Sequence, residues 1–436
     1  MERNYAGFAD KIVNANKQTE YDAFSKEMQQ KTKDVTQTGY CRFYIQNWLN
    51  YFNDKHVYLM PNPKKKATFV PETIMLSSEK IDELRKKTQD DIEGIYFSSS
   101  KNYEIALIKS PTNFRDYAGV IINSQNKNWT AGMVKLELKQ TAENNFEGIL
   151  YYADYSPNFQ KYEIKNGAFS NGDYLKENAK TEKPQGFEPY NDIETSNTVA
   201  AYRDVNDSTA YIRIKSFDDH FAKKIKSVVK ANEKKLKTKP YLIIDLRYNG
   251  GGSDFSYSPL MPYIYTQPIK KVGVDVYATP DNAQAWQRVI DDNPKLPKSV
   301  RNDISDIVAK MKEKPNQMVN IFEDHTDTLQ TFYPTTKKVV ILIDEDCGSS
   351  TEQFLIEARQ SSKVILAGHH TMGVLDYSNV RMVDFECMPL TLGYSTTRSR
   401  RIPNEAIDGK GVQPNVILDF NSKEWFNEVL TILKQK

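Results

Sequence analysis

Ser349 is a candidate nucleophile. It follows the apolar run of residues 339–343, which predicts a buried strand, and it opens a stretch rich in helix formers. A strand that enters a helix through a turn of small residues exposes a hydroxyl group where free N–H groups can stabilise an oxyanion. Serine and threonine are also ordinary helix caps, so the simpler interpretation is that Ser349, Ser350 and Thr351 only cap this helix.

A glycine-rich turn lies about one hundred residues earlier. Residues 241–247, YLIIDLR, predict a buried strand, and this strand runs into Tyr248, Asn249 and three glycines at 250–252. Consecutive glycines after a strand indicate close approach of the backbone to another group, and their N–H groups are unhindered donors. The competing explanation is a tight turn.

Together the two stretches resemble the C-terminal processing (tail-specific) serine peptidases and the tricorn core protease. In that family a D-L-R-x-N-x-G-G segment supplies an oxyanion donor, and a later S-x-x-E segment carries the nucleophile. Here residues 245–252 read DLRYNGGG and residues 349–352 read SSTE, in the same order. The resemblance implies a serine peptidase with Ser349 as nucleophile and the backbone N–H groups of Gly251 and Ser350 as oxyanion hole. It implies a peptide or protein substrate, and neither a cofactor nor a metal is expected.

The general base is not expected at the position that carries it in bacterial processing peptidases. Bacterial processing peptidases carry a catalytic lysine after a G-x-x-T-x-G segment, whereas residues 368–373, GHHTMG, are followed by Val374. Valine cannot accept a proton. The tricorn-like branch uses a histidine that often ends a helix as L-x-D-x-H, and residues 52–56 read FNDKH. The resemblance therefore assigns the base to His56. The alternatives are that His56 is a surface histidine beside a loop, and that His369 or His370 is the base.

A third match lies near the end of the chain. Residues 407–415, IDGKGVQPN, are similar to the family's I-E-G-x-G-V-x-P-D, with Asp408 in place of the glutamate. In tricorn this acid helps to organise the base through an intervening serine. Here the residue before His56 is Lys55, so the sequence does not show that serine link. On this resemblance Asp408 joins the predicted catalytic group. Cys347, two residues before Ser349, is interpreted as a structural cysteine because an apolar strand leads into it.

The patterns predict four regions. Residues 1–88 form a mainly helical segment that supplies His56, residues 89–170 a small antiparallel β domain, residues 171–197 a linker, and residues 198–436 the catalytic domain. Alternating strands and helices predict an α/β core, for which the resemblance implies a Clp-protease/crotonase-like fold. The β domain replaces the PDZ domain that processing peptidases often carry.

Two local patterns support these regions. Apolar residues at helical spacing predict a helix that ends before His56, and four period-two runs predict strands in the β domain. The helix carries Cys41, Ile45, Trp48, Leu49 and Phe52, and the strands lie at 103–108, 116–121, 133–138 and 146–152. Further helices are predicted at 283–290 and 300–314, as a lid over the site or as an oligomer contact.

Composition limits the other classes of function. The chain has 436 residues, 39% hydrophobic and 27% charged, with a net charge of +2. These values describe a globular protein without the basic excess of a nucleic-acid or membrane-surface binder. No membrane span and no signal peptide are recognised, although a mature exported chain would begin in the same way. The family favours a periplasmic or extracellular protein, and three cysteines cannot form a disulfide framework.

Two other functions use the same scaffold. One is a non-catalytic ligand- or peptide-binding protein, as in interphotoreceptor retinoid-binding protein, and the other is an esterase. Catalysis is favoured because the nucleophile, the glycine turn and the histidine occur together, which a binding protein would not require.

Overall fold

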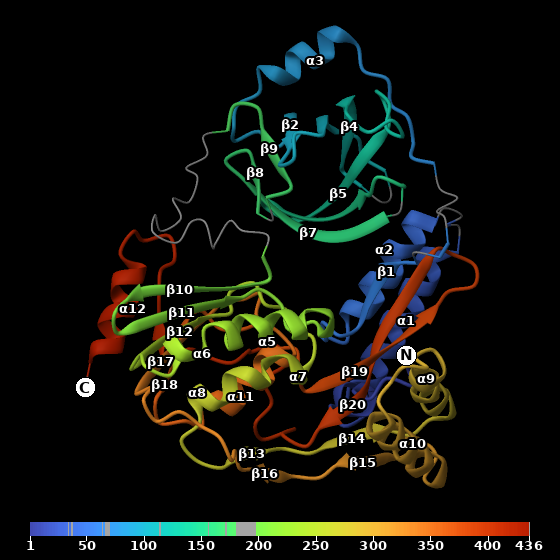
Figure 1. Cartoon of the computed structure of the whole chain (residues 1–436). Coiled ribbons are helices and arrows are strands. Elements are labelled where there is room, and N and C mark those ends of the chain that lie inside the picture. Colours follow the sequence, from blue (N-terminus) through green and yellow to red (C-terminus); the bar gives the residue numbers. More distant parts are fainter. Residues whose placement is uncertain are drawn as a thin grey trace.

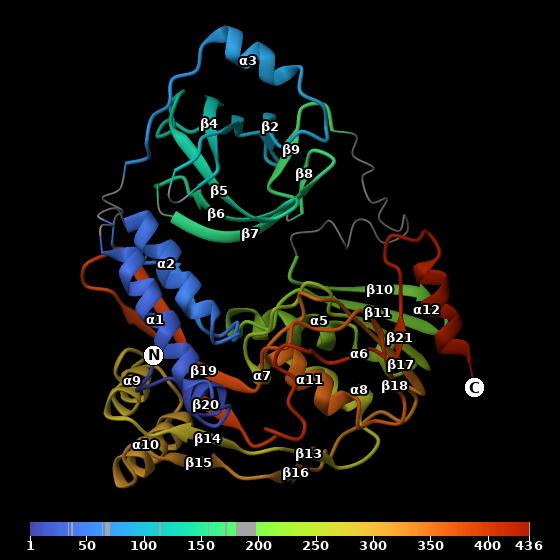
Figure 2. The same cartoon turned by 180° about the vertical axis from the view of Figure 1, so that it is seen from behind.

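A computed structural model describes residues 1–33, 35, 38–62, 64–65, 70–112, 115–155, 157–170, 172–179 and 198–435 (Figure 1). Figures 1 and 2 show a barrel at one end of the molecule and two sheets side by side at the other. The N-terminus lies beside one of these sheets and the C-terminus beside the other. In the described part of the chain, no helix has the length and apolar character needed to cross a membrane.

A six-stranded sheet forms the centre of the C-terminal half. Its strands follow the order β10 (Ala200–Asn206), β11 (Thr209–Ile214), β12 (Tyr241–Asp245), β17 (Lys338–Ile343), β18 (Val364–Gly368) and β21 (Val416–Ile417). Only β10 is antiparallel to its neighbour. The parallel strands read as continuous apolar runs because both faces of the sheet are covered. This confirms mixed helices and strands in the predicted α/β part.

Helices cover both faces of this sheet. Helix α12 (Trp425–Lys434) packs on one face through its buried aromatic and aliphatic side chains. The other face is covered by α5 (Ala222–Ala231), α6 (Glu233–Leu236), α7 (Asp254–Tyr257), α8 (Met261–Ile264), α11 (Ser350–Ala358) and the short turn η4 (Ser258–Leu260). An exposed turn, η3 (Asp219–Phe221), leads into α5. Because β12 and β17 are parallel neighbours, the loops that follow them emerge at the same edge of the sheet. These are the glycine turn and the Ser349 turn.

The second sheet joins distant parts of the chain. Its order is β1 (Tyr58–Pro61), β20 (Leu390–Ser399), β14 (Val274–Tyr277) and β15 (Met318–Phe322), and β19 (Tyr377–Asp384) also pairs with β20. The pairing of β1 with β20 joins the N-terminal segment to the catalytic part. The N-terminal helical elements are η1 (Ala9–Val13), α1 (Gln18–Thr32) and α2 (Thr38–Asn50). Leu49 and Phe52 pack with Tyr377 and Tyr394 in one core, so the predicted helix before His56 is confirmed.

The two predicted helices between the glycine turn and Ser349 are also confirmed. Helices α9 (Pro280–Asp291) and α10 (Lys298–Glu313) pack on β14 and β15 through Trp286, Val276 and Val319. A short antiparallel pair, β13 (Ile269–Lys271) and β16 (His325–Asp327), connects them to the six-stranded sheet. These contacts make α9 and α10 the cover of the second sheet.

The predicted small antiparallel β domain is a closed barrel of eight strands, and its neighbouring strands pair antiparallel. Its strands are β2 (Gly94–Ser98), β3 (Tyr103–Lys109), β4 (Tyr117–Ser124), β5 (Val134–Ala142), β6 (Asn145–Tyr151), β7 (Pro157–Lys165), β8 (Ala168–Phe169) and β9 (Tyr174–Lys176). The four predicted strands correspond to β3–β6. Pairing of β9 with β2 closes the barrel, and closure removes the exposed edges of an open sheet. Helix α3 (Ser78–Arg85) packs its Leu84 against the outside.

The predicted linker over residues 171–197 begins inside this barrel. Tyr174–Lys176 forms strand β9, and Tyr174 is buried in the barrel core. The strand was missed because three residues between charged and polar neighbours carry no period-two pattern. Residue 171 and residues 180–197 lie outside the described part of the chain.

Candidate active site

Ser349 occupies a sharp turn between β17 and α11. Its backbone has φ 54° and ψ −121°, whereas an ordinary helix cap is extended. A non-glycine residue in this region of φ and ψ is strained, and such strain is typical of a serine held at a strand-to-helix turn for reaction. Ser349 is also the cap residue of α11, and its N–H donates to the Glu352 side chain. The backbone conformation separates Ser349 from a residue that only caps.

The Glu352 carboxylate ties the Ser349 turn to the following loop. Its side chain is fully buried. Oε2 accepts the N–H of Ser349 at 3.1 Å and that of Val374 at 2.8 Å. Oε1 accepts the N–H of Gly373 at 2.7 Å and the hydroxyl of Thr371. A buried carboxylate with this many donors is fully satisfied, so it fixes the loop against the turn.

His56 reaches the same cleft from the turn between α2 and β1. Its Nδ1 lies 2.6 Å from the carbonyl oxygen of Tyr377. Because a carbonyl can only accept, Nδ1 carries the proton in this bond, and Nε2 of the neutral ring has a free lone pair. Asp54 supports the turn: its Oδ1 accepts the N–H of His56 at 2.8 Å, and its Oδ2 accepts the hydroxyl of Tyr5 at 2.6 Å.

A cleft of about 470 Å³ brings these groups together. Its lining comes from the His56 turn, the glycine turn, the Ser349 turn and strand β19. The lining residues are His56, Gly252, Ser253, Asp254, Phe255, Ser349, Ser350, Leu375, Ser378, Asn379 and Val380. No residue of α9 or α10 is among them, so the structure does not support a lid formed by these two helices.

The predicted oxyanion donors differ in what they contact. Ser350 is the first residue of α11, and its N–H has no acceptor in the described part of the chain. The N–H of Gly251 instead donates to Oδ1 of Asn249 at 3.1 Å. The N–H of Gly251, the predicted oxyanion donor, is therefore already paired in this structure. The next N–H, that of Gly252, has no acceptor among the described residues, and Gly252 lines the cleft.

Gly251 is needed for a steric reason. It has φ +100°, and a Cβ at this position would lie 2.5 Å from the carbonyl oxygen of Gly348 and 2.8 Å from Cβ of Ser349. Only glycine allows the two turns to approach this closely. The sequence could locate the three glycines but not which of their N–H groups is free, because that depends on the Asn249 side chain.

Asp408 does not hydrogen-bond to His56. Its Oδ1 accepts the N–H of Leu375 at 2.7 Å and that of Asp376 at 2.8 Å, next to Tyr377. It therefore supports His56 only through the backbone that carries the Tyr377 carbonyl. Oδ2 is buried, and no described residue hydrogen-bonds to it. Burial, with the nearby Asp54 and Asp376 carboxylates, raises the pKa of Asp408 to about 7.

The alternative bases are held away from the cleft. His369 uses both ring nitrogens, with Nδ1 2.8 Å from Oε1 of Glu345 and Nε2 2.9 Å from the Leu418 carbonyl. Nδ1 of His370 lies 2.8 Å from the Thr371 carbonyl. Neither residue lines the cleft. Val374 is buried, and its Cγ1 would lie 2.9 Å from a Cβ at Gly348.

Cys347 is not a competing nucleophile. Its side chain is fully buried, and Sγ lies 3.0 Å from the carbonyl oxygen of Leu246. Burial raises the pKa of the thiol well above its usual value, which removes the reactive thiolate. The predicted structural role of Cys347 is confirmed.

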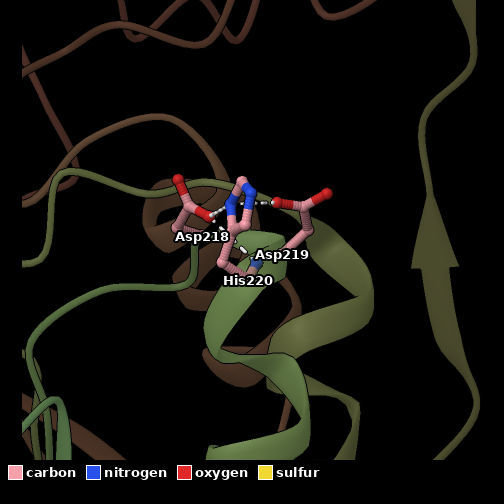
Figure 3. A group of neighbouring side chains, drawn as sticks. All are labelled: Asp218, Asp219 and His220. Atoms are coloured by element: carbon pink, nitrogen blue, oxygen red, sulfur yellow. Dashed lines mark hydrogen bonds and ion pairs between the residues drawn. The ribbon is translucent and has the colours of Figure 1, made fainter. Parts of the chain in front are cut away.

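An exposed group near the glycine turn contains His220, Asp218 and Asp219 (Figure 3). Nδ1 of His220 lies 2.6 Å from Asp218 and 3.0 Å from Asp219, and the imidazole side chain is 85% exposed. The hydrogen bond to Asp218 raises the pKa of His220. Asp218 also accepts the N–H of His220 as the cap of η3, so a local helix cap explains this group.

The chain is similar to known peptidases in sequence over part of its length and in fold. Residues 208–418 match the model of peptidase family S41. A structure of mature CPAF complexed with lactacystin is similar, with 13% identity and a TM-score of 0.51, over 99% of this chain and 95% of that one. A structure of an S41 protease from Bacteroides fragilis NCTC 9343 aligns with 11% identity and a TM-score of 0.40, over 99% and 95%. No curated protein matched the sequence. The likeness to CPAF indicates a shared fold.

Proposed function

We propose, for a serine-type peptidase whose residues 208–418 match family S41, that Ser349 cleaves peptide bonds through an acyl-enzyme with His56 as general base. His56 Nε2 takes the proton of the Ser349 hydroxyl while Oγ attacks the carbonyl carbon of the substrate. The imidazolium then protonates the leaving amine, and the C–N bond breaks. A water molecule, deprotonated by His56, releases the acid product and restores the serine.

The hydrogen bond from His56 Nδ1 to the Tyr377 carbonyl is the observation that carries this proposal. It selects the tautomer in which Nε2 is a base, and His56 lines the cleft that contains Ser349. A backbone carbonyl takes the orienting place that a carboxylate has in the Ser–His–Asp arrangement. Asp408 acts as a positioning residue through the backbone at Leu375 and Asp376.

The oxyanion would be bound by the N–H groups of Gly252 and Ser350. Both are free of other acceptors among the described residues, and both residues line the cleft. The Ser350 N–H also lies at the N-terminus of α11, where the helix dipole favours negative charge. One missing oxyanion donor typically raises the barrier by about 2.7–4 kcal/mol.

The same residues and the sheet topology support a specific branch of the family and a specific core fold. A tricorn-like branch is supported by Val374 in place of the lysine and by a base from the N-terminal segment. A Clp-protease/crotonase-like core is supported by the parallel strands β11, β12, β17, β18 and β21 between two layers of helices.

Hydrolysis of an unstructured protein such as casein tests the proposal. Ser349→Ala should abolish cleavage and leave the melting temperature nearly unchanged. Ser378→Ala is the matched control, because Ser378 lines the same cleft but hydrogen-bonds to Thr397 on β20. Cleavage that survives in a clean preparation of Ser349→Ala would reject the assignment, as would equal losses in the two variants.

A further inference from the structure

The barrel contains a cavity of about 300 Å³ that is separate from the cleft around Ser349. It is lined mainly by hydroxyl-bearing side chains from several strands and their connections. The lining residues are Ser98, Ser99, Ser100, Tyr103, Lys135, Leu150, Tyr151, Tyr152, Ala153, Asp173 and Tyr174. None of them belongs to the proposed peptidase machinery, and the barrel forms its own lobe in Figures 1 and 2.

Lys135 is the unusual residue of this cavity. The register between β4 and β5 shifts between Gly119 and Val120, which pair with Leu136 and Val134, so Lys135 is the extra residue of a bulge. A bulge redirects the side chain that it carries. Lys135 is only 3% exposed, and its ammonium lies 4.2 Å from the ring centres of both Tyr103 and Trp129.

The Lys135 ammonium is incompletely paired. It donates to the carbonyl oxygen of Tyr151, which uses one of its three N–H donors. Across the described residues, no carboxylate comes within ion-pair distance of Lys135. Burial lowers the pKa of Lys135 to about 8, so the side chain is still mainly charged at neutral pH. Burial of a cation that no carboxylate contacts directly is costly. The Asp154 carboxylate, which lies beyond ion-pair distance, and the two aromatic faces offset only part of that cost.

Neighbouring groups add further donors. The Tyr103 hydroxyl accepts from Nδ2 of Asn126 at 3.2 Å, and its own proton has no acceptor within the described part of the barrel. The Tyr174 residue is only 4% exposed, and no described residue hydrogen-bonds to its hydroxyl. Phenol and ammonium donors around one cavity suit an anion. The Asp173 carboxylate in the same lining would repel any anion, and it would repel a doubly charged phosphate more strongly than a singly charged carboxylate.

We propose that this barrel cavity binds a carboxylate group, held by the Lys135 ammonium and the Tyr103 and Tyr174 hydroxyls. The carboxylate belongs to a small apolar acid or to the end of a peptide chain, since the cavity volume is at the lower limit of ligand pockets. This site does not depend on the proposed catalytic role of Ser349.

Calorimetric titration of the full chain with 3-phenylpropionate tests the site, and 3-phenylpropionamide is the uncharged match. 3-Phenylpropionate should bind at least about tenfold more tightly than the amide, because the amide cannot form a charged hydrogen bond. Lys135→Met should weaken binding of the acid by a similar factor. Lys161→Met is the control, since Lys161 is also on the barrel but its side chain is 68% exposed. Inorganic phosphate should bind more weakly than the acid.

Two further measurements keep the outcome clear. The first titrates the Ser349→Ala protein with an acetylated tripeptide that ends in phenylalanine, both as the free acid and as the amide. This variant avoids cleavage of the peptide, and the comparison separates the two sources of the carboxylate. Binding of the peptide acid indicates a chain end, and binding of only 3-phenylpropionate indicates a small acid. Without ligand, Lys135→Met should melt at the same temperature as the wild type or higher. A lower melting temperature with unchanged binding of the acid would overturn the proposal, as would equal binding of acid and amide.

Discussion

Nδ1 of His56 lies 2.6 Å from the carbonyl oxygen of Tyr377, across the boundary between the N-terminal segment and the second sheet. The bond links the orientation of the base to the backbone of β19, which also lines the cleft through Ser378 and Val380. No acidic side chain is needed to select the tautomer, because the carbonyl can accept only from a protonated Nδ1.

Loss of the imidazole should remove most of the activity. We expect His56→Ala to lower kcat/KM at neutral pH by about 10²–10⁴-fold, the usual contribution of a positioned base. His370→Ala is the control, because its ring contacts the Thr371 carbonyl outside the cleft. A His56→Ala variant with close to wild-type activity would move the base to another residue.

The glycine turn should tolerate a methyl group at one position and not at the next. Gly251→Ala places Cβ 2.8 Å from Cβ of Ser349 at a φ of +100°, so kcat should fall far more than substrate affinity. Gly250→Ala is the matched control, since the nearest atom to its Cβ is the Asp346 carbonyl at 4.0 Å. Steady-state kinetics of the two variants measure the difference. Equal kinetics in both would mean that Gly251 only completes a turn.

Glu352→Gln should disturb both the stability of the fold and the reaction. The amide replaces one acceptor oxygen by a donor, so at least one of the N–H groups of Ser349, Gly373 and Val374 loses its partner. An unsatisfied buried donor costs about 1–3 kcal/mol of unfolding free energy. Denaturant unfolding measures this loss, with Glu345→Gln on the exposed surface as the control. An unchanged midpoint with normal turnover would show that the turn and the loop are not held by this carboxylate.

Asp408 should make the protein less stable as the pH rises. The folded-state pKa of about 7 lies above the usual 3.8, so the folded protein holds a proton that the unfolded chain has lost between these two values. The free energy of unfolding therefore falls as the pH rises from about 4 to 7, and stays reduced above pH 7. Asp408→Asn should flatten this dependence, by no more than about 4 kcal/mol, since one pKa unit is worth about 1.4 kcal/mol. A variant with the wild-type slope would assign the effect to another group.

The motifs and their order along the chain predicted much of the candidate site. The remaining features depend on packing and on backbone contacts that leave no sequence pattern. Ser349 and His56 could be predicted because a nucleophile turn and a helix-ending histidine leave sequence patterns. The Tyr377 carbonyl could not, because a backbone acceptor has no side-chain signal. The free N–H at Gly252 in place of Gly251 depends on how Asn249 folds back. Likewise, β9 closes the barrel through three residues that have no strand periodicity of their own.

Labelling with a fluorophosphonate, followed by mass-spectrometric mapping of the modified residue, tests the central claim most directly. The account predicts a single adduct on Ser349 in the wild-type protein, much slower labelling of His56→Ala at neutral pH, and no adduct in Ser349→Ala. Labelling of Ser350 or Ser378 in its place, or labelling of His56→Ala at the wild-type rate, would contradict it.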